Sequence, residues 1–432
     1  MSLVVHRAPV VLSPGVPAHA DGAVAVQDGR IVAVGGIDDV VRRVGLAEVH
    51  EWDGVLTPGL VNAHTHLQYT DMAAVGRASH DGFESWMSAF MELYPLPRDW
   101  SLSAAAGAAL CLRAGTTAVA EIVTDAEAGS AVHAAGLHGI AFWEVLGWTD
   151  SAWRLGGPDT VRAQLSVLPT PPAVGLSPHA IYSLDTEVIR DLSRLAAEWG
   201  VRQHIHAAES AWEDAYVRTG TGDLAERWRA NGRGEFALLH GGGVGTGVIP
   251  YLDALGALAP TTHLAHGIYV DADDRRLLRE RGVSVALCPR SNAVIGLDPP
   301  PVAAYLCEGN AIAVGTDSLS SSPSLSLWHD VAALYNLARA QGYAEADLHE
   351  RLFHAATAGG AHALGLDAAD PTGVLRVGAR ADLAVFPTSA TTPEDALVEL
   401  VEAGPAEASL TVVGGQVRWQ APAREERTAA NV

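Results

Sequence analysis

Between Pro58 and Leu366 the chain alternates short apolar runs with longer stretches rich in alanine and leucine. The runs begin with GVLTPGLVNAHTHLQYT and continue with TTAVAEIV, HGIAFWEVLG, AVGLSPHA, VRQHIHAAES, TTHLAHGI, VSVALCP and AIAVGTDS. Several are almost continuously apolar and end in a polar residue, which is typical of parallel strands buried on both faces. Seven or eight such β/α units favour a (β/α)8 barrel over an open, doubly wound sheet. The glycine run Gly241-Gly242-Gly243 also does not fit the G-x-G-x-x-G turn typical of the open sheet.

The two ends of the chain follow a different pattern, in which apolar and small polar residues alternate around glycine turns. AVAVQDGRIVAVG predicts a β-hairpin with its turn at Asp28-Gly29, and ADLAVFP and SLTVVGGQVRW predict further short strands. The fold expected is therefore α/β, with a small β-sandwich built from both termini around a TIM-type barrel. The predicted ranges are 1–57 and 367–432 for the sandwich and 58–366 for the barrel.

Composition narrows the possible partners and chemistries. The 432 residues include 28 basic and 50 acidic side chains, for a net charge of -22, so we expect neither nucleic acid nor an anionic membrane as a partner. All of the basic residues are arginines, which excludes a Walker A lysine, a Schiff base and a lysine carbamate bridging two metals. Three scattered cysteines, and an N-terminal apolar stretch too short and interrupted for a signal peptide, predict a cytoplasmic protein.

Polar residues that follow the apolar runs are rich in histidine. His64 and His66 are two positions apart, so an extended strand points both to the same side, where they can chelate one metal. Taken alone, this pair also fits two polar residues at a strand edge. Other strand ends contribute His206, Glu209, His266 and Asp317. Three neutral imidazoles and one carboxylate, completed by a water, suit Zn²⁺ or Fe²⁺, and a carboxylate beside such a water can shuttle protons.

Other readings stay open for individual residues. His204 is expected to face the side opposite to His206, as a packed or supporting histidine, and the same is expected of His263, three residues before His266. Asp317 alone could cap a helix.

The segments TPGLVNAHTH, HIHAAES, LAHG and VGTDSLSSSPSLSL resemble motifs of the amidohydrolase superfamily, in its branch of mononuclear aminohydrolases acting on purines, pyrimidines and triazines. The resemblance covers nearly the whole chain. It implies one divalent metal, Zn²⁺ with Fe²⁺ as the alternative, held by His64, His66, His206 and Asp317. It further implies that the catalytic residues are Glu209 as proton shuttle, His266 as the group that polarises the water, and Asp317.

The loop after His66 narrows the resemblance. Phe83-x-x-Trp86 resembles the lid of adenosine-type members. The methylthioadenosine/S-adenosylhomocysteine deaminases, however, carry other residues at the positions of Gln68 and Glu144. The combination is more similar to the aminodeoxyfutalosine deaminases of menaquinone biosynthesis, whose small-molecule substrate is an adenine nucleoside with a benzoate tail. The substrate contacts predicted on this basis are Gln68, Trp86, Glu144, His179, Arg290 and Asn292.

The sequence leaves several alternatives open. The benzoate requires a cation, for which Arg77, Arg154 and Arg290 are candidates, and Asn292 fits a turn former equally well. The alternative functions are a methylthioadenosine, S-adenosylhomocysteine or adenosine deaminase, another aminohydrolase or chlorohydrolase on the same scaffold, and a catalytically inactive assembly protein. A homo-oligomer is possible.

Overall fold

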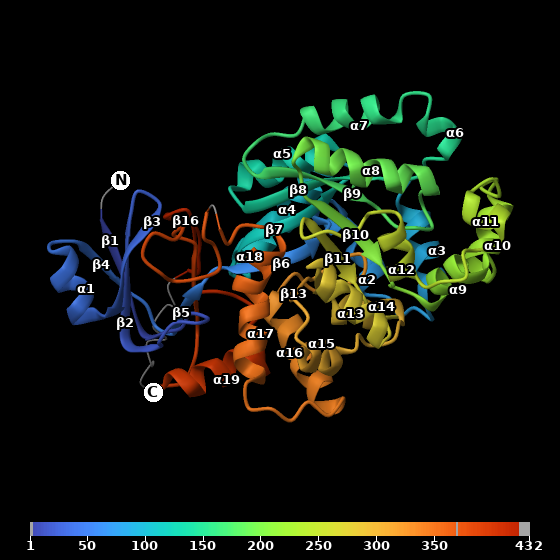
Figure 1. The fold of residues 1–432 in the computed structure, drawn as a ribbon. Coiled ribbons are helices and arrows are strands. Elements are labelled where there is room, and N and C mark those ends of the chain that lie inside the picture. The colour runs from blue at the N-terminus through green and yellow to red at the C-terminus, as the bar shows by residue number, and fades with distance from the viewer. Residues whose placement is uncertain (1–2, 369, 423–432) are drawn as a thin grey trace, which may run out of the picture.

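The computed structural model describes residues 3–368 and 370–422, which form two eight-stranded sheets lying side by side (Figure 1). The outer sheet contains β1 (Val4–Val11), β2 (His19–Gln27), β3 (Arg30–Gly36), β4 (Glu48–Glu51), β5 (Val55–Pro58), β14 (Leu383–Phe386), β15 (Leu410–Val413) and β16 (Gln416–Gln420). The barrel sheet contains β6 (Leu60–Thr65), β7 (Thr116–Val123), β8 (His138–Val145), β9 (Ala173–Pro178), β10 (Gln203–Ala207), β11 (Thr262–His266), β12 (Ser284–Leu287) and β13 (Ile312–Val314).

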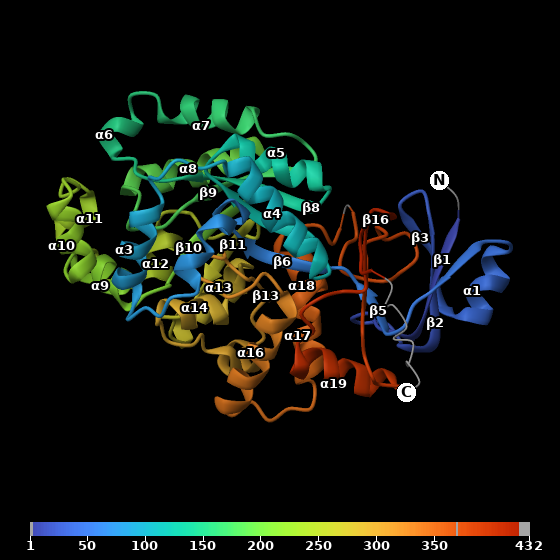
Figure 2. The ribbon, with the colours of Figure 1, turned by 180° about the vertical axis from the view of Figure 1, so that it is seen from behind.

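Helices follow the barrel strands and surround them (Figure 2). They are η1 (Leu67–Met72), α2 (Ala73–Gly76), α3 (Phe83–Leu93), α4 (Trp100–Arg113), α5 (Ala126–Ala135), α6 (Asp150–Trp153), α7 (Gly157–Ser166), α8 (Thr186–Trp199), α9 (Ala211–Thr219), α10 (Asp223–Ala230), α11 (Ala237–Gly241), α12 (Val248–Ala254), α13 (Ala272–Arg281), α14 (Pro289–Ile295), α15 (Val302–Glu308), α16 (Leu327–Ala340), α17 (Leu348–Ala356) and α18 (Ala358–Ala363). The outer sheet adds α1 (Ile37–Val44) and α19 (Pro393–Ala403).

All neighbouring barrel strands are parallel, in the order of the sequence from β6 to β13. The last strand returns to the first, because the backbone N–H of Asp317 donates to the carbonyl of His64 at 3.0 Å. The Asn62 side chain adds two bonds across the same seam, donating to Thr316 Oγ1 at 2.7 Å and accepting from Thr316 N at 3.1 Å. Every strand therefore ends at one rim, where barrel enzymes place their reacting groups.

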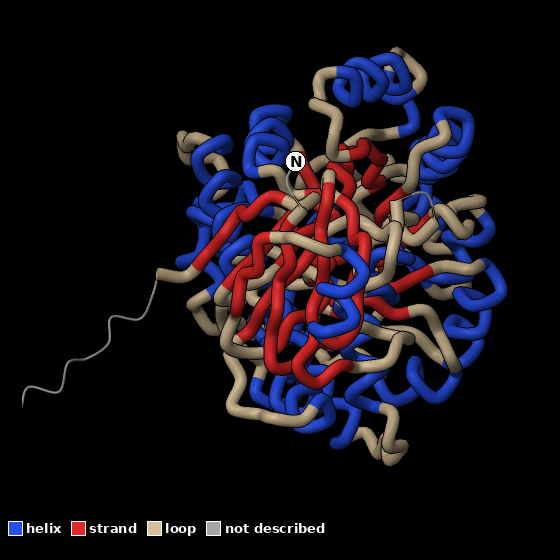
Figure 3. The backbone as a smooth tube through the Cα atoms, turned by 90° about the vertical axis from the view of Figure 1, so that its left-hand side faces the viewer, coloured by secondary structure: helices blue, strands red, loops and turns tan. Residues whose placement is uncertain are grey.

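The outer sheet is one hydrogen-bonded path, in the order β16-β15-β14-β5-β1-β2-β3, with β4 paired to β1. Figure 3 shows its strands facing the viewer, with the barrel helices around and behind them. The expected hairpin is present, because β2 and β3 pair antiparallel around Asp28 and Gly29, at φ values of 50° and 77°. Strand β5 joins the two halves by pairing with β1 on one side and β14 on the other.

The predicted fold class is confirmed by these two sheets, since each of the eight apolar runs contains one barrel strand. The division into domains stays a prediction, and residues 1–2, 369 and 423–432 of its outer ranges lie outside the described residues. Strand β5 extends to Pro58, one residue past the proposed boundary. None of the described helices combines the length and the apolar character needed to cross a membrane.

Candidate active site

Three histidines and an aspartate meet at the rim formed by the carboxyl ends of the barrel strands. We call His64, His66, His206 and Asp317 the ligand cluster. His66 Nε2 lies 3.3 Å from His206 Nε2 and 3.7 Å from Asp317 Oδ1, and His64 Nε2 lies 3.5 Å from the same oxygen. All four side chains are buried. Four potential ligand atoms from three parts of the chain thus converge on one point.

The protonation of these imidazoles suits metal binding. Burial lowers the pKa of His66 to about 3 and the pKa of His206 well below its ordinary value, so both rings are neutral. Nδ1 of His206 donates to the backbone carbonyl of His179 at 3.1 Å, which leaves the Nε2 lone pair free. Nε2 of His64 has no hydrogen-bond partner among the described residues, although it is buried. The residues therefore fit one divalent ion bound through Nε2 atoms.

Asp317 is held as an acceptor by three hydroxyl or backbone groups. Ser291 Oγ and Ser321 Oγ donate to its Oδ2 at 2.7 and 2.9 Å, and the backbone N–H of Ser318 donates to Oδ1 at 2.7 Å. Burial opposes ionisation, but the close approach of His64 keeps the pKa of Asp317 well below its usual range. Asp317 adopts φ +58°, a left-handed conformation that costs free energy in a non-glycine residue and is typical of functional sites.

Glu209 and His266 face each other beside the ligand cluster. Their Oε1 and Nε2 atoms are 3.5 Å apart. Burial raises the pKa of Glu209 to about 8, and the charge of Asp317 acts in the same direction. The backbone N–H of Glu209 donates to Glu213 Oε2 at 2.9 Å, which fixes the turn after β10. A carboxyl that titrates near neutral pH is suited to accepting and returning a proton.

A cavity of about 480 Å³ opens above these groups. Its floor contains His66, His206, Glu209, His266 and Asp317. Aromatic side chains form much of its wall, namely Tyr69, Phe83, Trp86, Phe90, Tyr94, Tyr182 and Trp228. A largely apolar pocket with a few convergent polar groups at its floor is typical of a small-molecule site. We call this cavity the pocket.

Comparisons with known proteins agree with this geometry, since residues 55–418 match the amidohydrolase family. The chain belongs to that family. One relative is the 5-methylthioadenosine/S-adenosylhomocysteine deaminase of Nitratidesulfovibrio vulgaris (strain Hildenborough), which is 31% identical over 425 residues, covering 92% of this chain and 87% of the relative.

Two solved structures resemble this amidohydrolase along almost its whole length. An adenosine deaminase from Xanthomonas campestris with bound zinc has a TM-score of 0.78 and 25% identity, covering 96% of this chain and 93% of that one. Helicobacter pylori aminofutalosine deaminase in complex with methylthio-coformycin has a TM-score of 0.82 and 21% identity, covering 96% and 99%.

Three of the predicted substrate contacts line the pocket of the amidohydrolase: Trp86, Glu144 and His179. Trp86 Nε1 donates to the Ser320 carbonyl at 2.9 Å, which holds α3 over the opening. Glu144 Oε1 lies 3.9 Å from His206 Nδ1, and burial raises the pKa of this carboxyl to about 8.

The other three lie behind the lining. The Gln68 amide is buried and accepts from the backbone N–H of Thr124 at 3.0 Å, because η1 turns it away from the pocket. Arg290 donates to Ser324 Oγ at 2.9 Å. Asn292 is fully buried beside His266, whose pKa its approach raises against the larger lowering by burial.

None of the arginines proposed for a substrate carboxylate lines the pocket. Arg77 is exposed after α2, and Arg154 Nε donates to Glu187 at 2.9 Å on the outer surface. Instead, Arg227 and Arg233 line it, from α10 and the turn that follows. Sequence reasoning missed both, because nothing in their spacing shows that this long connection folds back over the rim.

One supporting residue was also missed, although the sequence held a visible signal for it. Glu121 is the single charged residue in the buried strand β7, and its Oε1 accepts from the backbone N–H of Leu67 at 2.9 Å. This bond fixes the chain immediately after His66. His204 was predicted to face the side of β10 opposite to His206, and this is wrong: the two rings lie 5.8 Å apart and share the inner side of the barrel, as residues two positions apart in a strand must. As a supporting histidine it is buried against the ligand cluster, with its Nε2 3.2 Å from Nδ1 of His64.

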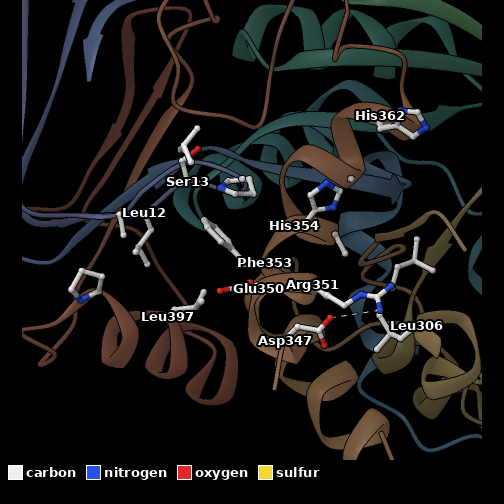
Figure 4. A pocket seen from close by; sticks show the side chains of 18 of the residues that line it. Leu12, Ser13, Leu306, Asp347, Glu350, Arg351, Phe353, His354, His362 and Leu397 are labelled. Atoms are coloured by element: carbon white, nitrogen blue, oxygen red, sulfur yellow. Dashed lines mark ion pairs between the residues drawn. The ribbon is translucent and has the colours of Figure 1, made fainter. Parts of the chain in front are cut away.

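A second cavity, of about 1000 Å³, lies away from this chemistry (Figure 4). It is lined by residues after β1, including Leu12 and Ser13, and by α17 and α19. It also reaches Ile312, at the amino end of β13, so it opens at the rim opposite the ligand cluster. Function is placed in the smaller pocket because the converging metal-binding groups are there.

Proposed function

We propose that this amidohydrolase is a metal-dependent deaminase that converts 6-amino-6-deoxyfutalosine to futalosine and ammonia, as a step of menaquinone biosynthesis. The observation that carries the proposal is the position of Glu209, which lies 3.5 Å from His266 beside the ligand cluster at the floor of an aromatic pocket. This arrangement places a proton carrier where a flat heterocycle can stack.

The protein's own residues can move the protons that hydrolytic deamination requires. Attack at C6 of an adenine takes one proton from water and adds one at N1, and the proton of the new C6 hydroxyl group then passes to the departing amine as the C6–N bond breaks. The Glu209 carboxyl, with its pKa near 8, can accept and release each of them at neutral pH. Ligating atoms of His266 and Asp317 lie within 4.8 Å of one another, close enough for both to hold one water molecule by hydrogen bonds.

The ligand cluster is proposed to hold one divalent ion, which when bound would polarise that water for attack. Zn²⁺ is the ion proposed, because neutral imidazoles with one carboxylate suit it, and Fe²⁺ is the alternative. The similar deaminase from Xanthomonas campestris, which has bound zinc, supports this choice. A single ion is expected because no lysine is present to form a bridge to a second.

The substrate is the finer part of the proposal. The structural likeness to an aminofutalosine deaminase and the two arginines at the pocket support an adenine nucleoside with an acidic tail. The 31% identity to a 5-methylthioadenosine/S-adenosylhomocysteine deaminase favours a second candidate, in which those nucleosides are the substrates.

Ammonia release tests both candidates. The purified, zinc-loaded protein is assayed with aminodeoxyfutalosine, adenosine, methylthioadenosine, S-adenosylhomocysteine, guanine and cytosine, with a chlorotriazine as a further arm. We expect the highest kcat/KM for aminodeoxyfutalosine. If methylthioadenosine or S-adenosylhomocysteine is faster, the second candidate is correct, and if only the chlorotriazine reacts, the protein is not a deaminase.

A further inference from the structure

We propose that Arg227 and Arg233 bind a carboxylate at the end of the substrate farthest from the adenine ring. The inference rests on the proposed deaminase function and assigns substrate specificity to two residues outside the ligand cluster. Both arginines line the pocket and are partly exposed, whereas Glu144, Glu209 and Asp317 are buried in it. The pocket therefore runs from an acidic floor to a basic rim.

Arg233 is held in place by its neighbours. Its Cζ lies over the ring of Trp228, 4.8 Å from the ring centroid, and its backbone N–H donates to the Trp228 carbonyl at 2.8 Å. Trp228 Nε1 in turn donates to the carbonyl of Tyr182, a residue of the pocket lining. Stacking of this kind orients a guanidinium while its N–H groups stay available to a ligand.

Arg233 lies near the exposed chain that follows β8, at the opening of the pocket. A Cβ built on Gly147 would lie 3.6 Å from its Nη2, and Gly147 is the second residue after β8, the strand that carries Glu144. The pKa of His179, which lines the pocket, is lowered to about 4, mainly by burial, and the charges of His266, His64 and Arg233 act in the same direction. The guanidinium therefore lies at the opening of the pocket, within electrostatic reach of its lining.

Arg227 adds a second cation on the same side. It lies on α10, and Asn231, four residues further along, lines the same pocket. No carboxylate in the described part of the chain forms an ion pair with Arg227 or Arg233, whereas Arg218 of the neighbouring α9 pairs with Asp214 at 2.7 Å. Helices α9 to α11 lie at the edge of the barrel remote from the outer sheet (Figure 1), so this basic rim faces outward.

A carboxylate fits this rim better than a phosphate ester. Guanidinium groups bind carboxylates and phosphates alike through paired N–H donors, so the preference rests on charge. A chain with a net charge of -22 repels polyanions at long range, so a singly charged group is favoured.

The test combines two variants, Arg227→Met and Arg233→Met, with substrates that differ in charge. The substrates are aminodeoxyfutalosine, its methyl ester and adenosine 5′-monophosphate. The control is Arg229→Met, because Arg229 lies on the same helix but outside the pocket lining and donates to the Gly220 carbonyl at 2.7 Å. We expect KM for the acid to rise about ten-fold in both variants, with kcat little changed. KM for the ester, and both values in Arg229→Met, should stay near wild type.

Equal losses on the acid and the ester would overturn the assignment, because the arginines would then act on the fold or on the nucleoside as a whole. Faster turnover of the monophosphate than of the acid would show that the rim binds phosphate, and the carboxylate assignment would be wrong. If the wild type releases ammonia from none of these nucleosides, the proposed function itself is contradicted, and this assignment with it.

Discussion

The ligand cluster depends on which nitrogen of each imidazole carries the proton. His206 keeps its Nε2 lone pair free because Nδ1 donates to the carbonyl of His179. His64 can bind through Nε2 in the same way only if its proton is on Nδ1, which lies 3.2 Å from Nε2 of His204. A buried histidine that touches neither substrate nor ion thus orients one that binds the ion.

This role of His204 predicts a difference between two substitutions. His204→Leu keeps much of the volume but removes the acceptor, so the affinity for Zn²⁺ should fall roughly 10- to 100-fold. His204→Gln can place an amide oxygen near the position of Nε2 and should retain most of the affinity. Competition with a chelating dye measures both constants. Equal affinity in the two variants would show that His204 only fills space.

Glu209 is expected to be catalytic without being a ligand. Glu209→Gln keeps the shape but cannot accept a proton, so kcat should fall by at least ~10²-fold while metal content stays near wild type. Metal analysis and ammonia release on the same preparation check this. Glu226→Gln, at an exposed position on α10, is the control. Loss of metal in Glu209→Gln would instead make Glu209 a ligand.

Individual strands and helices were predictable to different degrees. The barrel strands followed from the sequence because burial on both faces demands continuous apolar runs, and His64 and His206 followed because polar residues after such runs reach one rim. The positions of residues on the connections between strands could not be predicted in this way. Gln68 is only two residues from His66, yet η1 turns its side chain away from the pocket, where its amide oxygen accepts a hydrogen bond from the backbone N–H of Thr124.

The placement of Arg233 shows the same limit. Spacing along the chain says nothing about where a long helical connection packs. That position depends on tertiary contacts such as the one between Trp228 and the Tyr182 carbonyl, and no local pattern records them.

A buried carboxyl beside strand β14 makes the stability of the protein depend on pH. Asp382, just before it, is buried, and burial raises its pKa from 3.8 to about 6, although it accepts from Gly414 N at 2.6 Å and Arg380 Nε at 3.1 Å. Between these two pH values the folded chain keeps a proton that the unfolded chain has released, so the contribution to the free energy of unfolding falls as pH rises through this window.

Asp382→Asn removes this dependence. The free energy of unfolding of the wild type, relative to the variant, should fall by about 2–3 kcal/mol between pH 4 and 6 and then stay constant. Urea unfolding at several pH values measures it. A difference that rises with pH in this window would mean that the two donors hold the carboxylate ionised.

The whole molecule is tied together at the barrel rim. The ligand cluster takes its members from the end of β6, from β10 and from the loop after β13, so its four side chains connect the first, a middle and the last barrel strand. Any ion bound there stabilises the folded chain over the unfolded chain, in which these groups are dispersed.

Metal removal should therefore destabilise the protein. After treatment with a chelator, we expect Tm to fall and activity to be lost, and one equivalent of Zn²⁺ per chain should restore both. Calorimetry and elemental analysis across a zinc titration follow the two together. Two tightly bound ions per active chain would contradict the single-ion site.

The outer sheet draws its strands from both ends of the chain, and this affects the order in which the protein can be completed during translation. Strands β1 to β5 leave the ribosome early, but one edge of β5 has no partner until β14 has been synthesised after the entire barrel. An unpaired edge is a template for pairing with other chains. The nascent protein therefore has to keep that edge from aggregating while the barrel is made, and the outer sheet is completed only after the barrel strands have been synthesised.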